Sequence, residues 1–257
     1  MLGRVSSLRR RLGGGETVVG TFAKLPGADA AGALAGCGFD FAIVDREHSQ
    51  LTSGEARQLV RDLRGHGLPA LVRLPAVDRG EVNRMLEAGA DGIQLSIVGR
   101  VEEVERLRGS MRYAPAGSRS SSLAHAGAGY GATSLPDYLA SQQGEGAPLA
   151  VLQIETMATG DDLAAIAAAG ADVLFVGTTD LLVDAGLDAA AAAARAAEIV
   201  EAAAGAGIPW GGFAADAAAA SELAGRGARY LVVGSDLALL RGGCAACLAS
   251  LRESVHA

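Results

Sequence analysis

Eight short apolar segments, separated by longer stretches of helical period, constrain the fold of this chain more than any other feature. Apolar runs that are bounded by turn residues and alternate with helices are typical of a parallel sheet covered on both faces. In chain order the segments are VVGTF (18–22), FAIVD (41–45), ALVR (70–73), GIQL (92–95), AVLQIE (150–155), VLFVG (173–177), IPWGGF (208–213) and YLVVG (230–234). Eight strand–helix units in 257 residues predict a closed (β/α)8 barrel, the TIM-barrel fold.

A glycine-containing phrase precedes four of the predicted strands. A helix commonly closes with a glycine in the left-handed conformation, so each phrase is expected to lead from a helix into a strand. The four phrases are CGFD (37–40), AGAD (88–91), AGAD (169–172) and RGAR (226–229). No GxGxxG follows the first strand, which argues against a dinucleotide-binding fold.

Two segments depart from the regular alternation. Residues 110–148 form an insertion rich in Gly, Ser and Pro between the fourth and fifth predicted strands, and long insertions of this kind are usually functional or lie at an interface. The stretch 187–207 is low in complexity, but alanine has the highest helix propensity, so a helix is expected there. We expect residues 1–257 to form a single barrel domain with this one long insertion.

Composition narrows the class of function. A formal net charge of −7 with only 22 Lys and Arg residues provides no basic patch for nucleic acid. No apolar run reaches the roughly 18 residues that span a membrane. The basic N-terminal stretch MLGRVSSLRRRLGGG lacks the apolar core of a secretory signal. Three cysteines are too few, and odd in number, for a disulfide framework, so a reducing, cytoplasmic location is expected.

Cys244 and Cys247 are spaced as a CxxC pair, which invites a redox or metal-binding interpretation. Neither a second CxxC nor a nearby histidine accompanies them in this Ala- and Leu-rich stretch. Because a buried free cysteine behaves as a small hydrophobic residue, we expect the pair to pack within a C-terminal helix.

Ionisable and amide side chains gather at the carboxyl ends of the predicted strands, where TIM-barrel active sites lie. The amino ends of the strands show no comparable cluster. The residues concerned are Asp45, Glu47 and His48 after the second strand, Arg73 on the third, Gln153 and Glu155 on the fifth, and Asp180 after the sixth. Their conjunction on one face of the predicted barrel indicates an active site.

These residue types suit proton abstraction or carbon–carbon bond cleavage next to a carbonyl group. Glu155 and Asp180 are suitable ligands for a hard divalent cation such as Mg²⁺ or Mn²⁺, which can act as a Lewis acid. Arg73 offers a permanent positive charge to a developing enolate or to a carboxylate. His48, oriented by Asp45, is suited to proton transfer near neutral pH.

Each of these residues also has a structural interpretation. A single acidic residue at a strand end is most often a helix N-cap or a surface charge. Arg73 alone would serve equally well as the partner of a buried carboxylate, and His48 alone as an ordinary loop histidine. His125 stays open because it lies in the insertion.

Six motifs, in the same order along the chain, resemble those of the HpcH/HpaI aldolases. This family comprises metal-dependent class II pyruvate aldolases and includes 2-keto-3-deoxy sugar-acid aldolases. The matching stretches are GTFAKLP (20–26), GFDFAIVDREH (38–48), RLP (73–75), PAGSR (115–119), QIET (153–156) and GTTDL (177–181). Each motif is short, whereas six in order are specific.

The resemblance implies a (β/α)8 barrel of the phosphoenolpyruvate/pyruvate type. It also implies a homo-oligomer, a trimer or a hexamer, in which the C-terminal helix is exchanged between subunits. Glu155 and Asp180 would hold Mg²⁺, Mn²⁺ or Co²⁺, and a pyruvate-type 2-oxo acid would chelate that ion before it reacts with an aldehyde.

The remaining roles follow from the same resemblance. Arg73 would bind the 2-oxo acid and stabilise its enolate, while Asp45 and His48 would form the catalytic pair that moves protons. Glu47 would help to position these groups without contacting the substrate itself. Further substrate contacts would come from Gln153, Thr178 and Thr179. No Schiff-base lysine is implied, and Lys24 is given no covalent role.

The chain departs from the family pattern in two regions. One is the turn expected to bind the substrate carboxylate, where the family usually has Pro and Ser; the other is the insertion, together with the segment after the fourth strand. The replacing residues are Thr178, Thr179 and Leu182 in the turn, and Ser96, Ser118, Ser120 and His125 elsewhere. Because the expected metal ligands and the catalytic pair are kept, the chemistry is implied more firmly than the substrate.

Three functions are open from the sequence. The first is a metal-dependent carbon–carbon lyase, an aldolase that forms or cleaves 4-hydroxy-2-oxo acids through a pyruvate-type enolate. The second is an oxaloacetate-type decarboxylase, or other enolate chemistry in a specialised biosynthetic pathway. The third is a barrel that binds a 2-oxo acid without catalysis.

Overall fold

The computed structural model describes residues 5–255, in which eight parallel strands close into a barrel in sequence order. The start of the basic N-terminal stretch, residues 1–4, lies outside this range, as do residues 256–257. The strands are β1 (Val18–Ala23), β2 (Phe41–Asp45), β3 (Ala70–Leu74), β4 (Gly92–Leu95), β5 (Leu149–Ile154), β6 (Val173–Val176), β7 (Trp210–Ala214) and β8 (Tyr230–Ser235). The predicted (β/α)8 barrel is confirmed, and the predicted strand bounds differ from the observed ones by two residues at most.

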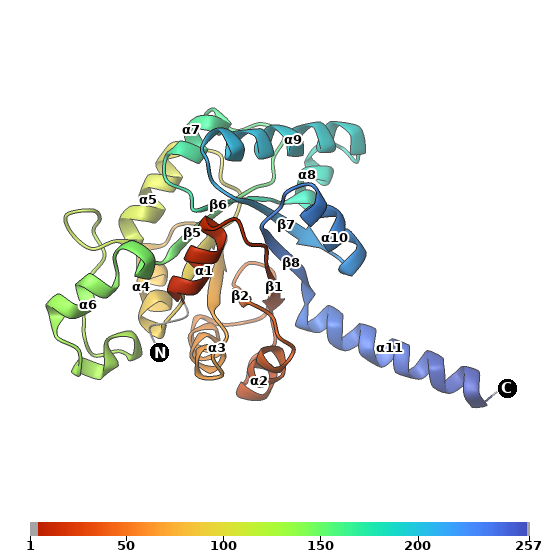
Figure 1. Ribbon diagram of the computed structural model, residues 1–257, viewed down its shortest axis with the longest axis horizontal. Coiled ribbons are helices and arrows are strands. Elements are labelled where there is room, and N and C mark those ends of the chain that lie inside the picture. Colours follow the sequence, from red (N-terminus) through yellow and green to blue (C-terminus); the bar gives the residue numbers. More distant parts are fainter. Residues whose placement is uncertain (1–4, 256–257) are drawn as a thin grey trace.

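Helices alternate with the strands and surround the barrel (Figure 1). The helices that follow strands are α2 (Ala28–Gly36), α3 (Ser53–Gly65), α4 (Arg79–Ala88), α5 (Val101–Met111), α7 (Leu163–Ala168), α8 (Thr178–Asp184), α9 (Ala189–Gly205), α10 (Ala217–Gly225) and α11 (Asp236–Val255). The helix predicted in the alanine-rich stretch is therefore confirmed as α9. None of the helices within residues 5–255 is long and apolar enough to cross a membrane.

A short helix, α1 (Val5–Gly13), precedes the barrel and was not predicted. Its Leu8 and Leu12 are buried in one cluster with the first residues of several strands, among them Val18, Phe41 and Tyr230. This cluster fills the amino-terminal end of the barrel, so α1 closes that end with apolar side chains. The opposite, carboxyl end is left to the polar side chains.

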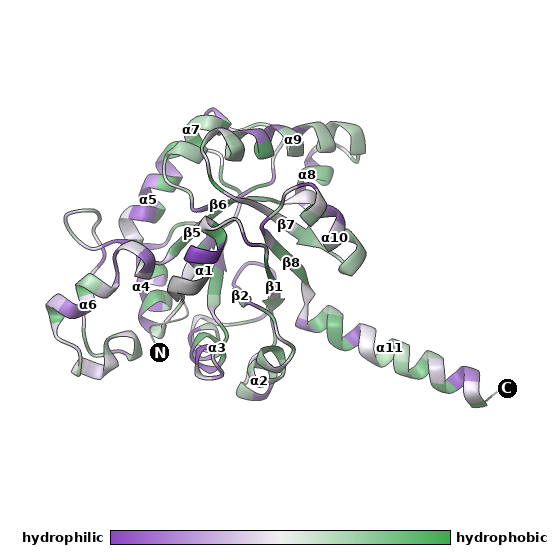
Figure 2. Ribbon diagram, viewed as in Figure 1, coloured by the Kyte–Doolittle hydropathy of each residue, from purple (hydrophilic) through white to green (hydrophobic). Residues whose placement is uncertain are grey.

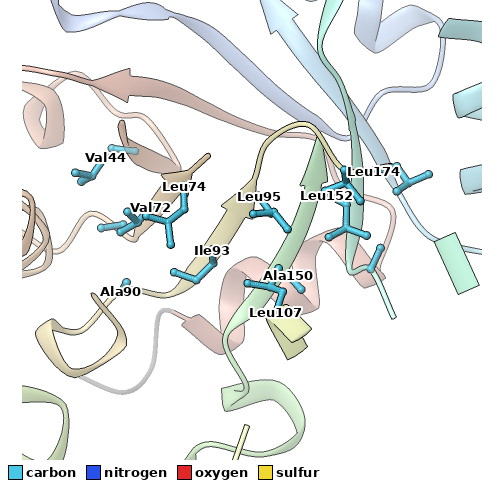
Figure 3. Close-up of a cluster of buried hydrophobic side chains, with 14 of the residues drawn as sticks. Val44, Val72, Leu74, Ala90, Ile93, Leu95, Leu107, Ala150, Leu152 and Leu174 are labelled. Carbon is cyan, nitrogen blue, oxygen red and sulfur yellow. The ribbon is translucent and has the colours of Figure 1, made fainter. Parts of the chain in front are cut away.

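Successive side chains along each strand point alternately toward the surrounding helices and toward the interior of the barrel. Outward-facing residues pack against the helices, and Figure 3 shows this layer with Val72, Ile93 and Leu152 on three strands and Leu107 on α5. Inward-facing residues are apolar at the start of each strand. At the ends of β2 to β5 the inward positions carry polar groups, which are Asp45, Arg73, Gln94 and Gln153.

The repeated glycine phrase has a second function besides ending a helix. Gly89 adopts φ 108°, as expected for a glycine that closes α4. Two residues later, Asp91 is buried, accepts a hydrogen bond of 2.7 Å from the backbone N–H of Ala70, and pairs with Arg64. The aspartates of two other phrases accept a backbone N–H of the preceding strand in the same way, Asp40 from Val19 and Asp172 from Ala150. Each of these aspartates therefore ties adjacent strands together at their amino ends.

The insertion packs beside α4 and contains η1 (Ala126–Gly131), α6 (Leu135–Ser141) and η2 (Gly144–Gly146). Buried Arg119 lies over the ring of Tyr113 and donates hydrogen bonds to Asn83 and Gln142. His125 is also buried, and its ring contacts Tyr138. The insertion is thus an ordered part of the molecule.

The last helix, α11, leaves the barrel and projects away from it (Figure 1). Much of its length is coloured as hydrophobic in Figure 2, and Leu240, Leu251 and Val255 are 58%, 55% and 69% exposed. Cys244 and Cys247 lie in this helix, as predicted, but both are exposed. The expectation that they are buried is wrong for the single chain, because within residues 5–255 no helix packs along most of the length of α11.

Candidate active site

The centre of the candidate site is a buried ion pair between neighbouring strands. Asp45 ends β2, and the register places it directly beside Arg73 of β3. The two side chains form a bidentate pair, in which Arg73 Nε lies 2.9 Å from Asp45 Oδ1 and Nη2 lies 2.7 Å from Oδ2. Both residues face the interior, so the guanidinium group is fixed at the carboxyl end of the barrel.

Asp45 also fixes the turn that carries His48. Its Oδ1 accepts the backbone N–H groups of Glu47 at 3.1 Å and His48 at 3.2 Å. Although burial alone would raise the pKa of Asp45, the hydrogen bonds and the charge of Arg73 lower it to about 2. Asp45 is thus a carboxylate that orients His48 through the main chain.

Glu47 lies between the imidazole and the arginine. Its Oε2 is 3.8 Å from His48 Nε2 and 3.4 Å from Arg73 Nε, and it accepts a hydrogen bond of 2.6 Å from Ser96 Oγ. The imidazole itself is 58% exposed at the mouth of the barrel. The structure therefore brings Glu47, rather than the carboxylate of Asp45, next to the ring of His48.

Glu155 directly follows β5 and is almost completely buried. Its two oxygens accept hydrogen bonds from the backbone N–H of Ile97 at 2.9 Å and from Gln153 Nε2 at 2.5 Å. Gln153 is oriented in turn by Gln94, whose amide nitrogen lies 2.7 Å from its Oε1. Burial, together with the charges of Glu47 and Asp180, raises the pKa of Glu155.

Asp180 lies in the first turn of α8 and lines a hollow with Glu155, Glu47 and His48. The space beside Glu155 depends on Gly177, because a Cβ atom there would lie 2.6 Å from Glu155 Oε2. Within residues 5–255, no group of three or more His, Cys, Asp and Glu side chains is placed to hold a metal ion. The protein would thus supply two carboxylates, with water and substrate oxygens as the other ligands.

This donor set fits a hard divalent cation. Carboxylate oxygens are the ligands that Mg²⁺ and Mn²⁺ prefer, and Mg²⁺ is usually held by one or two of them. The raised pKa of Glu155 has its physical cause partly in neighbouring negative charges, which a cation would compensate. Glu155 and Asp180 are the residues that could hold the ion.

A cavity of about 300 Å³ opens above these groups. Every residue for which a substrate contact is expected lines it, namely Arg73, Gln153, Thr178 and Thr179, together with His48 and Asp180. Further lining residues to which the sequence assigned no substrate contact include Phe22, Lys24, Phe213 and Ser235. These too lie at or just after strand ends, so the rule that located the other residues would have located them.

Comparisons with known proteins agree with the fold. The profile of the family described as HpcH/HpaI aldolase/citrate lyase matches residues 19–242. The hydroxypyruvate/pyruvate aldolase of Roseovarius nubinhibens is 34% identical over 242 residues, which is 91% of this chain and 92% of that protein. The 5-keto-4-deoxy-D-glucarate aldolase of Salmonella arizonae is 30% identical over 233 residues, 89% of this chain and 90% of that protein.

Solved structures extend the likeness to three dimensions. The crystal structure of an HpcH/HpaI aldolase/citrate lyase family protein from Burkholderia cenocepacia J2315 has a TM-score of 0.87 and 29% sequence identity, covering 96% of this chain and 99% of that chain. The profile match, the two sequence relatives and this structure span nearly the same residues. The chain therefore belongs to the HpcH/HpaI aldolase/citrate lyase family and is an enzyme of the aldolase and lyase class.

Proposed function

We propose that the protein is a divalent-metal-dependent carbon–carbon lyase, which forms or cleaves 4-hydroxy-2-oxo acids from a pyruvate-type 2-oxo acid and an aldehyde. The observation that supports this most is the convergence of a buried Arg73–Asp45 pair and two carboxylates, Glu155 and Asp180, on one open end of the barrel. The family membership and the names of the relatives agree with it.

Glu155 and Asp180 would hold Mg²⁺, Mn²⁺ or Co²⁺. A divalent ion bound there would act as a Lewis acid on the carbonyl group of the 2-oxo acid. Gln153 orients Glu155 through its amide group, and Gly177 keeps the neighbouring space free. The exposed hydroxyl groups of Thr178 and Thr179, which begin α8, would contact the substrate carboxylate.

Arg73 would stabilise the developing negative charge of the reaction, and His48 would transfer protons. Arg73 is held in position by Asp45, so its charge is available to a developing enolate without rearrangement. His48 lies at the open mouth beside Glu47, where its ring can take a proton from the 2-oxo acid or return one to the new hydroxyl group. Asp45 and Glu47 position these two groups.

An aldehyde screen with pyruvate and Mn²⁺, read by the loss of pyruvate, tests the proposal. Consumption should require both an aldehyde and the metal ion. Incubation with oxaloacetate alone separates this activity from a decarboxylase, because decarboxylation needs no aldehyde. Calorimetric titration with Mn²⁺ separates it from a non-catalytic barrel: we expect binding to the wild type and none to Glu155→Ala.

We also propose that the protein works as a homo-oligomer, a trimer or a hexamer, in the cytoplasm. The exposed apolar residues of α11 support the first point, because a second copy of the same chain would cover them through exchange of this helix. Three free and exposed cysteines support a reducing compartment.

A further inference from the structure

Lys24 is the single lysine of the chain, and the other 21 of its 22 Lys and Arg residues are arginine. It follows β1 directly and lines the same cavity as Arg73 and His48. Its backbone N–H and that of Leu25 both donate hydrogen bonds of 2.8 Å to the buried carboxylate of Asp236, at the start of α11. The loop that carries Lys24 is therefore fixed to the neighbouring strand end.

The ammonium group of Lys24 has three N–H donors, and two of them contact the protein. Its Nζ lies 3.1 Å from Asp45 Oδ2 and 3.0 Å from the carbonyl oxygen of His48. An ammonium group has three N–H donors, so these contacts leave one free to face the cavity. Asp45 is already neutralised by the bidentate Arg73, and a second cation is not needed to stabilise it.

Lys24 approaches the cavity from a different direction than Glu155 and Gln153, while it shares the carboxylate of Asp45 with Arg73. Glu155 and Gln153 lie at the end of β5, whereas Lys24 follows β1. In a barrel closed in the order β1 to β8, β1 and β5 lie on opposite sides. A second substrate entering the cavity would therefore meet Lys24.

We propose that Lys24 is a specificity-determining residue, whose ammonium group binds a carboxylate on the aldehyde that reacts with the 2-oxo acid. This inference rests on the proposed aldolase function. An anionic aldehyde would enter a site that already contains four carboxylates and the anionic 2-oxo acid, so it requires a cation on its own side. Lysine suits this task because its ammonium is a compact point charge, which leaves room that the fork of an arginine would fill.

The test compares two aldehydes of the same length that differ in charge, 4-oxobutanoate and its methyl ester, with pyruvate and Mn²⁺. In the wild type, kcat/KM should favour the carboxylate. In Lys24→Met this preference should fall roughly 10- to 100-fold, as expected for the loss of a charge-assisted hydrogen bond. Lys24→Arg keeps the charge and should retain part of the preference for the carboxylate.

The outcomes separate this inference from the function on which it rests. If Lys24→Met lowers kcat/KM for both aldehydes by the same factor, the residue only positions Asp45 and His48, and the inference is wrong. If the wild type consumes no pyruvate with any aldehyde, the proposed function itself is wrong.

The single lysine also permits a measurement that does not depend on turnover or on a folded variant. Protein labelled with ¹³C at lysine Cε gives one resonance from this residue. With Mg²⁺ present, 4-oxobutanoate should shift that resonance by more than the methyl ester does. Equal shifts with the two compounds, or no shift with either, would overturn the inference.

Discussion

Five hydrogen-bond donors converge on the carboxylate of Asp45, two from Arg73, two from the backbone of Glu47 and His48, and one from Lys24. This arrangement orders three strand ends around one anion. It also means that the guanidinium group of Arg73 is positioned before any substrate arrives. Such preorganised charges are among the largest contributions to catalysis.

Replacement of Arg73 is expected to affect the reaction more than the binding of the metal ion. Arg73→Ala should lower kcat for pyruvate addition by about 10²–10³, because it removes the group that stabilises the developing negative charge. Arg73→Lys keeps a charge near Asp45 and controls for the loss of the ion pair. Steady-state kinetics, with Mn²⁺ affinity measured by calorimetry, would check this; a wild-type kcat in Arg73→Ala would contradict the assigned role.

The pKa of Asp45 has a consequence for stability at low pH. Because its pKa is about 2 in the folded protein and 3.8 ordinarily, ionised Asp45 stabilises the fold fully above about pH 4. That contribution, on the order of 2 kcal/mol, should be lost as the pH falls from about 4 to about 2. Urea unfolding between pH 5 and pH 2.5 should therefore show a smaller decrease in stability for Asp45→Asn than for the wild type. Parallel decreases would rule out this contribution.

At the scale of elements, the buried aspartates of the glycine phrases hold the strands in register. Asp91 is the most buried of them and joins β3, β4 and α3 through Ala70 and Arg64. Its removal would leave the buried backbone N–H of Ala70 without this acceptor, and would remove the carboxylate that pairs with the partly exposed Arg64. The same contact, from an aspartate to the backbone of the preceding strand, recurs because each strand of a barrel must be aligned with the one before it.

Asp91→Ala should lower the free energy of unfolding by about 1–3 kcal/mol, the cost of leaving a buried hydrogen-bonding group without its partner. Asp62→Ala is the matched control, since Asp62 is partly exposed on α3 and, within residues 5–255, its carboxylate accepts one hydrogen bond, from the side chain of Gln58. Its effect should stay within about 0.5 kcal/mol. Urea denaturation at neutral pH measures both, and similar values for the two variants would contradict the account of the glycine phrases.

Helix α11 should determine the oligomeric state. Leu240→Glu combined with Leu251→Glu places charges on its exposed apolar surface, and should convert the proposed trimer or hexamer into smaller species. Ser254→Glu adds a charge to the same helix without removing apolar surface, and should leave the assembly unchanged. Light scattering coupled to size-exclusion chromatography gives the masses. A monomeric wild type would show that α11 needs no partner copy.

At the scale of the whole molecule, the sequence predicts the barrel because its strands are apolar, short and regularly spaced. The ends of those strands also predict the polar cluster, since parallel strands bring their carboxyl ends to one face. The helix α1 is less apparent, because Leu8 and Leu12 alone mark a buried side among its residues 8–13. The exposure of α11 cannot be predicted from the chain alone, since its composition suits a buried helix equally well.

The partners of the side chains within the site are the part that sequence cannot predict. His48 follows Asp45 by three residues, which suggests direct contact, yet the register of β2 and β3 turns Asp45 toward Arg73. The imidazole is left beside Glu47. The contact of Lys24 with Asp45 was not predicted for the same reason, because it joins residues at the ends of different strands. Such contacts depend on strand register and side-chain rotamers, which the order of residues does not state.

The central claim is that this end of the barrel, with a divalent metal ion, forms an enolate from a 2-oxo acid. Exchange of the pyruvate methyl protons in D₂O, followed by proton NMR without any aldehyde, tests that step alone. With Mg²⁺, which is diamagnetic, the methyl signal should disappear under wild-type protein, and it should persist in EDTA or with Glu155→Gln. Exchange at the full rate in EDTA, or none with the metal ion present, would contradict the claim.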